Sequence, residues 1–149
     1  MFYALLILFL IIFDQLSKYF VVENFSHGET LSFFEGVFHL TYVQNRGIAF
    51  GMFQNSVKLV SILTIIIIIG IGIHIGKELK NSRKIEKIAY SFIFAGALGN
   101  MIDRIFRGFV VDMMDFKIFW TYIFNLADAW ICIGAFLLIV DYFVGRRKK

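Results

Sequence analysis

The chain has 149 residues, of which 59% are hydrophobic and 18% aromatic, and its mean hydropathy is +0.76. Such an apolar composition lies far outside the range of soluble globular proteins and indicates a membrane protein of one domain, residues 1–149, with no repeat or low-complexity segment. The net charge of +4 suits anionic lipid headgroups, so it requires no nucleic acid as a partner.

Four apolar segments are long enough to cross a bilayer. A helix needs about 20 residues to cross a hydrocarbon core of roughly 30 Å. The expected spans are residues 2–22, 56–76, 85–105 and 123–145. The sequence therefore predicts an all-α membrane protein with four transmembrane helices and a small extracytoplasmic β-rich segment.

The first span, residues 2–22, carries Asp14 and Lys18, which are four residues apart and so share one helix face. The two charges can neutralise each other, with Lys18 either snorkelling toward the interface or belonging to a site. The span has no charged start and no small-x-small cleavage pattern after it. We therefore expect it to stay in the mature protein rather than to be removed as a signal peptide.

The next segment, residues 23–55, contains the stretch GVFHLTYVQ, in which residues 37–43 alternate as in a strand. Four aromatic side chains lie nearby: Phe33, Phe34, Phe50 and Phe53. We expect a small sheet or flap on the outer membrane surface. An aromatic interface anchor with no further role is the alternative.

The third span ends in GALGNMIDR, where Asn100, Asp103 and Arg104 follow several small residues. Small residues let helices approach closely, and polar side chains can then form hydrogen bonds across the contact. Asp103 can pair with Arg104 or with Lys18, and such a network would either brace the helices or form part of a site.

Further acidic residues surround the second outer segment, residues 106–122. Asp112 follows an apolar run, and Asp128 begins the last span three residues after Asn125. Because consecutive spans are antiparallel, the end of one lies beside the start of the next, so Asp112 and Asp128 can meet near the outer membrane boundary. Asp115 is expected to be a solvated loop residue.

Two carboxyl groups in a low-dielectric pocket share one proton, because both cannot ionise cheaply. One can then activate water while the other protonates a carbonyl oxygen or a leaving amine, as aspartic peptidases require. A proton relay in a transporter, or an ion site, would use the same pair.

Two other chemistries are less well supported. A Ser–Lys peptidase would need Ser17 to touch Lys18, but adjacent helical positions point about 100° apart. Zinc chemistry would need clustered ligands, whereas the histidines are scattered and no HExxH motif occurs. These are His27, His39 and His74, and the last should lie near the cytoplasmic end of its span. We expect no metal and no cofactor.

Lysine and arginine gather in two places beside the spans, residues 77–87 and the tail 146–149. Such residues collect on the cytoplasmic side of membranes. Both termini are therefore expected to be cytoplasmic, with the outer segments on the far side. Cys132, the only cysteine, lies in the last span and is expected to be a small packing residue, so no disulfide can form within the chain.

Five short blocks of the chain together resemble bacterial lipoprotein signal peptidase, the type II signal peptidase family. In chain order they are DQLSK at 14–18, NRGIAF at 45–50, GNMIDR at 99–104, VVD at 110–112 and FNLAD at 124–128. Each block alone is weak, but the five occur in the family's order and cover essentially the whole chain.

The resemblance implies an aspartic endopeptidase of the bacterial cytoplasmic (inner) membrane, surrounded by membrane lipids, and we expect it to be a monomer. It would cleave diacylglyceryl-modified prolipoproteins just before the lipidated Cys. The family's catalytic aspartates correspond to Asp112 and Asp128. Residues that line or brace the pocket correspond to Asp14, Lys18, Asn45, Gly47, Asn100, Asp103, Arg104, Asn125 and Ala127. The chain departs from the family's usual residues at Ala95, Met113 and Ala129, which alters the pocket's shape rather than its acidic groups.

Overall fold

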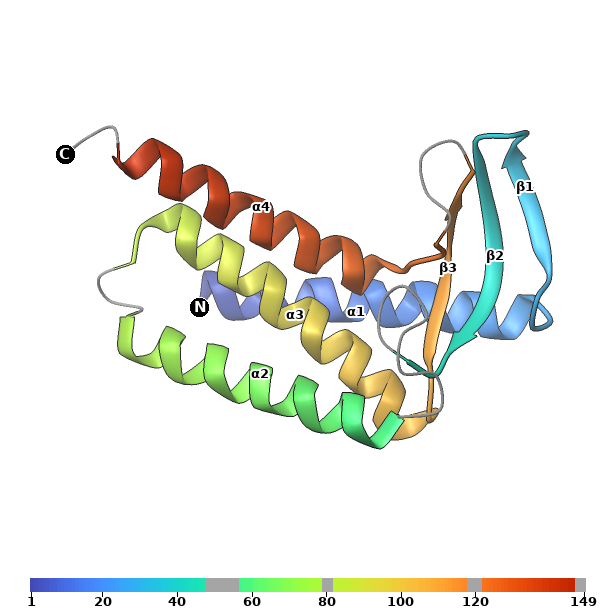
Figure 1. Ribbon diagram of the computed structural model, residues 1–149, viewed down its shortest axis with the longest axis horizontal. Helices are drawn as coiled ribbons and strands as arrows, with labels where there is room; N and C mark the ends of the chain where they lie inside the picture. Colours follow the sequence, from blue (N-terminus) through green and yellow to red (C-terminus); the bar gives the residue numbers. More distant parts are fainter. Residues whose placement is uncertain (48–56, 79–81, 118–121, 147–149) are drawn as a thin grey trace.

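The computed structural model describes residues 1–47, 57–78, 82–117 and 122–146. In chain order its elements are α1 (Phe2–Asn24), β1 (Thr30–Phe34), β2 (Phe38–Asn45), α2 (Val57–Glu78), α3 (Lys84–Phe106), β3 (Val110–Phe116) and α4 (Leu126–Arg146). The four helices lie side by side, and the three strands form a sheet across one end of them (Figure 1). The last residues of α2 and α4 and the first residues of α3 lie at the opposite end.

Each predicted span corresponds to one of these helices, with ends that differ by three residues or fewer. Within the described ranges, two helical stretches, Phe2–Asn24 and Leu126–Val144, are long and apolar enough to cross a membrane. A shorter apolar stretch, Ser61–His74, lies within α2. The protein is thus mostly helical, as the hydropathy pattern predicted.

Small residues on α3 and α4 allow these helices to pack closely, as the sequence predicted. A Cβ added at Gly96 would collide with the carbonyl oxygen of Ala127, and one added at Gly134 would lie 2.6 Å from the carbonyl oxygen of Ala89. Helix α3 also contacts α1 and α2, so it is the central helix of the bundle. Its C-terminal half therefore faces the elements that carry the other polar residues.

The sheet is antiparallel with strand order β1-β2-β3. The strand predicted at residues 37–43 is confirmed within β2, which begins after a turn in which Gly36 adopts a φ of +69°. Strand β3 was not predicted, although its β-branched and apolar residues suit a strand. It pairs with β2 such that Val43 lies opposite Asp112.

A small apolar core holds the sheet against the end of α1. It consists of Val21, Tyr42, Val111 and Met113, each buried. Because successive strand residues point to opposite faces, Asp112 points away from its neighbours Val111 and Met113. The packing of these two residues therefore fixes the direction of the carboxylate between them.

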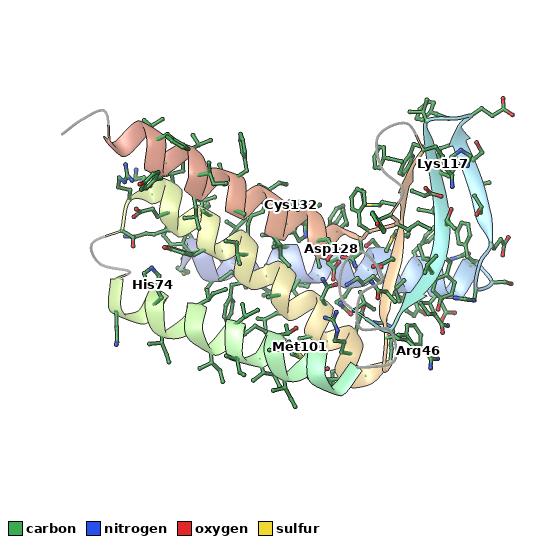
Figure 2. The ribbon with its side chains drawn as sticks, in the orientation of Figure 1. Arg46, His74, Met101, Lys117, Asp128 and Cys132 are labelled. Carbon is green, nitrogen blue, oxygen red and sulfur yellow. The ribbon has the colours of Figure 1, made fainter. Side chains whose placement is uncertain are left out.

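Two expectations about single residues were wrong. Asp115 is not a solvated loop residue: it belongs to β3, is 3% exposed, accepts a hydrogen bond from Thr41 Oγ1 at 3.0 Å and pairs with Lys117 at 2.6 Å. Cys132 is not a packing residue, because it lies on the exposed face of α4 (Figure 2). Phe33 and Phe34 are exposed on β1, whereas Phe50, Phe53, Lys80 and the tail after Arg146 lie outside the described residues.

Candidate active site

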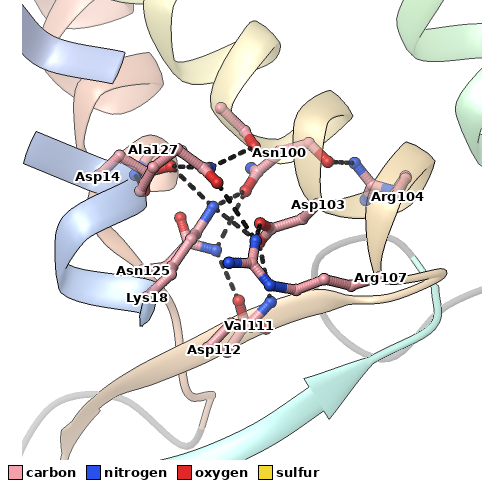
Figure 3. Close-up of polar contacts among 12 residues, drawn as sticks. Asp14, Lys18, Asn100, Asp103, Arg104, Arg107, Val111, Asp112, Asn125 and Ala127 are labelled. Atoms are coloured by element: carbon pink, nitrogen blue, oxygen red, sulfur yellow. Dashed lines mark hydrogen bonds and ion pairs between the residues drawn. The ribbon is translucent and has the colours of Figure 1, made fainter. Parts of the chain in front are cut away.

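A polar cluster lies where α1, α3 and α4 meet the sheet (Figure 3). Its side chains come from five elements, α1, β2, α3, β3 and α4, and from the residues next to them, and most of them are buried. They are Asp14, Lys18, Asn45, Asn100, Asp103, Arg104, Arg107, Asp112, Asn125 and Asp128.

The start of α4 orients two of these residues through helix capping. Asn125 precedes the helix, and its Oδ1 accepts the backbone N–H of Asp128 at 3.1 Å. In return, Asp128 Oδ2 accepts the backbone N–H of Asn125 at 3.3 Å. This reciprocal pattern satisfies N–H groups that a helix start leaves free. It also explains why α4 begins at Leu126 rather than at residue 123.

Strand β3 supplies the second carboxylate after a sharp turn. Helix α3 ends where Gly108 adopts a φ of +76°, which suits a glycine after a helix C-terminus. The chain then returns as β3, and Asp112 accepts hydrogen bonds on both oxygens. Asn125 Nδ2 donates to Oδ1 at 2.6 Å, and Asn45 Nδ2 donates to Oδ2 at 2.9 Å. Asn45 reaches it as a diagonal neighbour on the adjacent strand.

Two amides connect Asp112 with Asp128, which lie in different elements. Asn125 Nδ2 donates to Asp112 and also to Asn100 Oδ1 at 3.2 Å. Asn100 Nδ2 then donates to Asp128 Oδ1 at 2.8 Å. The sequence predicted that these two carboxylates can meet, and the structure links them through this chain of hydrogen bonds.

Asp128 influences the ionisation of Asp112. Burial, together with the negative charge of Asp128, raises the pKa of Asp112 to about 7 against the effect of the amide donors. Asp112 can therefore gain or lose a proton near neutral pH. This is the property expected of a carboxyl pair that shares one proton.

Lys18 does not snorkel to an interface, because its side chain is 0% exposed. Its Nζ lies 2.9 Å from Asp14 Oδ2 and 3.1 Å from Asp103 Oδ2. The mutual neutralisation of Asp14 and Lys18 is thus confirmed. The Ser17 hydroxyl donates to the backbone oxygen of Asp14 at 2.7 Å, within the same helix. It therefore does not form the pair with Lys18 that a Ser–Lys peptidase would need.

Of the two partners expected for Asp103, Lys18 is confirmed, and the second ion pair is formed with Arg107 rather than with Arg104. Arg107 lies one turn after Asp103 on the same face of α3, whereas the adjacent Arg104 points elsewhere. Arg104 donates to the carbonyl oxygens of Gly47 at 3.1 Å and Asn100 at 3.4 Å. It thereby holds the end of β2 beside the carboxyl pair.

All the site residues that the sequence suggested lie in or beside this one cluster, including Ala127 and Gly47. Sequence reasoning missed two members, Gln15 and Arg107. Gln15 Nε2 donates to the carbonyl oxygen of Gly99 at 3.0 Å, and its Oε1 accepts from Arg107 at 3.2 Å. The spacing of four residues between Asp103 and Arg107 was a signal that could have found the second.

The histidines lie apart from this cluster. His27 packs against Tyr42, and His74 lies 2.8 Å from the Tyr90 hydroxyl, toward the end of α2 away from Asp128 (Figure 2). In the described part of the chain, no three His, Cys, Asp or Glu residues are grouped so that they could hold a metal ion. The arrangement is one of two carboxyl groups braced by amides and buried ion pairs.

Comparison with known proteins shows which family the chain resembles. The profile described as "Signal peptidase (SPase) II" matches residues 6–144. The lipoprotein signal peptidase of Fusobacterium nucleatum is 52% identical over 149 residues, covering 100% of this chain and 90% of that protein. The corresponding protein of Clostridioides difficile is 41% identical over 153 residues, with full coverage of both chains.

Two solved structures have the same fold as this chain. A bacterial membrane enzyme determined by the in meso method at 2.3 Å resolution superposes with a TM-score of 0.89 and is 33% identical, covering 99% of this chain and 90% of that one. A second bacterial membrane enzyme, at 1.9 Å resolution, gives a TM-score of 0.82 with 33% identity, covering 94% of this chain and 91% of that one. The sequence blocks, the buried carboxyl pair and these relatives lead to one conclusion: the chain belongs to the signal peptidase II family.

Proposed function

We propose that Asp112 and Asp128 are the catalytic pair of an aspartic endopeptidase that removes signal peptides from diacylglyceryl-modified prolipoproteins, cleaving just before the lipidated Cys. Membership of the family gives the class of reaction, removal of a signal peptide by a protease. The observation that supports this pair is the connection of two acidic side chains from separate elements through Asn125 and Asn100.

The chemistry needs one water molecule and one proton shared by the pair. The ionised carboxylate removes a proton from water, whose oxygen attacks the scissile carbonyl carbon. The protonated carboxyl group donates its proton to the leaving nitrogen as the C–N bond breaks. One aspartate has then gained a proton and the other has lost one. The next cycle can start with the two roles exchanged, or after a proton has moved between the two aspartates. No covalent intermediate with the enzyme forms.

The four helices are proposed to cross the cytoplasmic (inner) membrane as a single domain, residues 1–149. At about 1.5 Å per residue, helices of 21 to 23 residues reach about 32 to 35 Å, enough for the hydrocarbon core. Large apolar side chains are exposed along three of them. Examples are Phe9 and Leu16 on α1, Ile66 and Ile69 on α2, and Phe136 and Phe143 on α4.

The orientation follows from the positions of the basic residues. Lys77, Arg83, Lys84 and Lys87 lie at or near the α2–α3 connection, at the end of the bundle away from the sheet (Figure 1). Basic residues favour the cytoplasmic side. Both termini would then be cytoplasmic, and the carboxyl pair would lie near the outer face.

The residues around the end of β2 are proposed to receive the substrate. A signal peptide arriving as a helix must unwind near the cleaved bond, and its freed backbone groups need polar partners. Asn45, Gly47 and Arg104 lie beside the carboxyl pair and carry such groups. All residues of the site come from one chain, which supports a monomer.

The decisive experiment measures cleavage of a diacylglyceryl-modified precursor by the purified wild type and by Asp112→Asn and Asp128→Asn. An amide keeps the shape of each side chain but removes its acid-base function, so the rate should fall by about 10² to 10⁴-fold. Asp115→Asn is the matched control, because Asp115 is also a buried carboxylate of β3 but bonds to Thr41 and Lys117. Wild-type turnover in either of the first two variants would contradict the proposal.

A further inference from the structure

Two buried carboxylates of the bundle bind the backbone just before each proposed catalytic residue. Asp14 Oδ1, on α1, accepts the N–H of Ala127 at 2.9 Å, and Ala127 precedes Asp128. Asp103 Oδ2, on α3, accepts the N–H of Val111 at 3.1 Å, and Val111 precedes Asp112. Each bond therefore fixes the main-chain position from which a catalytic side chain begins.

Lys18 connects these two contacts. Its Nζ contacts Asp14 Oδ2 at 2.9 Å and Asp103 Oδ2 at 3.1 Å, and all three side chains are fully buried (Figure 3). An ammonium group has three N–H donors. The third reaches Asn100 Oδ1 at 3.0 Å, so every donor of Lys18 has an acceptor.

The contact with Asn100 also determines which way its amide faces. Asn100 Oδ1 accepts from Lys18 at 3.0 Å and from Asn125 Nδ2 at 3.2 Å, so its NH₂ group is left to donate to Asp128 at 2.8 Å. Turning the amide over would place its N–H groups against the ammonium. The charge of Lys18 therefore directs an amide donor at one of the two catalytic carboxyl groups.

We propose that Lys18 is a positioning residue that sets the separation and orientation of Asp112 and Asp128, by joining the Asp14 and Asp103 contacts and by orienting Asn100. Lys18 contacts Asp14, Asp103 and Asn100, so it acts on the catalytic pair through these residues. The inference rests on the proposed function, because it takes Asp112 and Asp128 as the catalytic pair.

The geometry explains why lysine is suited to this position. Its compact ammonium group meets three acceptors on two helices, whereas the planar fork of arginine presents its donors in a fixed plane. Methionine has a similar length but no donor, so it would leave the carboxylates of Asp14 and Asp103 without their shared cation. The hydrogen bonds of Gln15 with Gly99 and Arg107 would still connect α1 with α3, and Arg107 would still pair with Asp103.

The test compares Lys18→Met and Lys18→Arg with the wild type, using a lipidated precursor and correcting the rate for the folded fraction. A displacement of about 1 Å at a reacting group can cost about 10²-fold in rate. We expect kcat to fall by about that factor in both variants, while KM changes by less than about 3-fold. If Lys18→Met does not fold, Lys18→Arg, which keeps the charge, carries the test.

The pH dependence of the rate distinguishes a role of Lys18 in positioning the catalytic pair from a role only in holding the helices together. The charged groups that face Asp112 are Asp128 on α4, Lys18 on α1 and Arg104 on α3, and the amides of Asn45 and Asn125 lie beside it. The positive charge of Lys18 lowers the pKa of Asp112. In Lys18→Met the acidic limb of the pH profile should therefore move to higher pH. Wild-type kcat and an unmoved limb in the folded variants would overturn the proposal, as would a raised KM with unchanged kcat.

A control variant at the other end of the bundle measures what the loss of an ion pair does when that pair is far from Asp112 and Asp128. Asp141, 5% exposed on α4, pairs with Arg83 before α3, far from the carboxyl pair. Asp141→Asn should lower stability while leaving kcat and the pH profile unchanged. If Asp112→Asn and Asp128→Asn stay active, the proposed function fails; if they are inactive but the Lys18 variants keep full kcat, only the positioning role fails.

Discussion

Replacing Asp112 by Asn should make the protein more stable at alkaline pH, although the cleavage rate should fall by about 10² to 10⁴-fold. The side chain is 3% exposed, and burial together with Asp128 raises its pKa from 3.8 to about 7. Because each pH unit corresponds to about 1.4 kcal/mol, ionised Asp112 destabilises the folded state by on the order of 4 kcal/mol relative to its neutral form. Asparagine keeps the shape without this charge.

The sign follows from the direction of the pKa change. Because the pKa is higher in the folded than in the unfolded state, the contribution of Asp112 to stability is complete below about pH 4 and is lost as pH rises through about 7. Asparagine does not titrate. The free energy of unfolding of Asp112→Asn, relative to the wild type, should therefore rise by about 3 kcal/mol between about pH 5 and pH 8.

The assay is reversible denaturant unfolding in detergent at several pH values, with both proteins measured side by side so that other titrations cancel. The amide loses one of the two hydrogen bonds that Asn45 and Asn125 donate to Asp112, a constant cost of about 1 to 3 kcal/mol. That cost shifts the whole curve but not its slope. A stability difference that stays the same across this pH range would refute the reasoning that the pair shares a proton.

Three further predictions concern packing, capping and ion pairs. Gly96→Leu should destabilise the bundle by about 3 kcal/mol or more in thermal unfolding, whereas Gly70→Leu should stay within about 1 kcal/mol, because only the first site lacks room for a Cβ. Asn125→Ser should keep the helix cap, with a melting temperature within about 2 °C of the wild type, but its cleavage rate should fall by about 10²-fold. Asn125→Ala should lose both the cap and the cleavage activity. Arg107→Met should lower stability by about 1 to 3 kcal/mol and Lys117→Met by less than about 1 kcal/mol, because these cations are 24% and 51% exposed.

The positions of the helices, and the acidic residues that are candidates for the site, could be predicted from the sequence. A long apolar run is a local property, and the cost of exposing a backbone to lipid leaves a helix as its natural conformation. Buried charges are also visible in the sequence, because polar residues inside apolar segments stand out and usually mark a site. That is why the order of residues alone was enough to select Asp14, Lys18, Asp103 and Asp128 as candidate site residues.

The partners of these groups were decided by the tertiary structure. Strand β3, with its buried Asp115, depends on pairing with β2, a segment about 70 residues earlier in the chain. Likewise, Asp103 binds Arg107 rather than the adjacent Arg104, because the two arginine side chains leave α3 in different directions and because Arg104 donates to the carbonyl oxygen of Gly47, just after β2. Which donor meets which acceptor depends on distances between elements, and periodicity along one chain segment contains no such information.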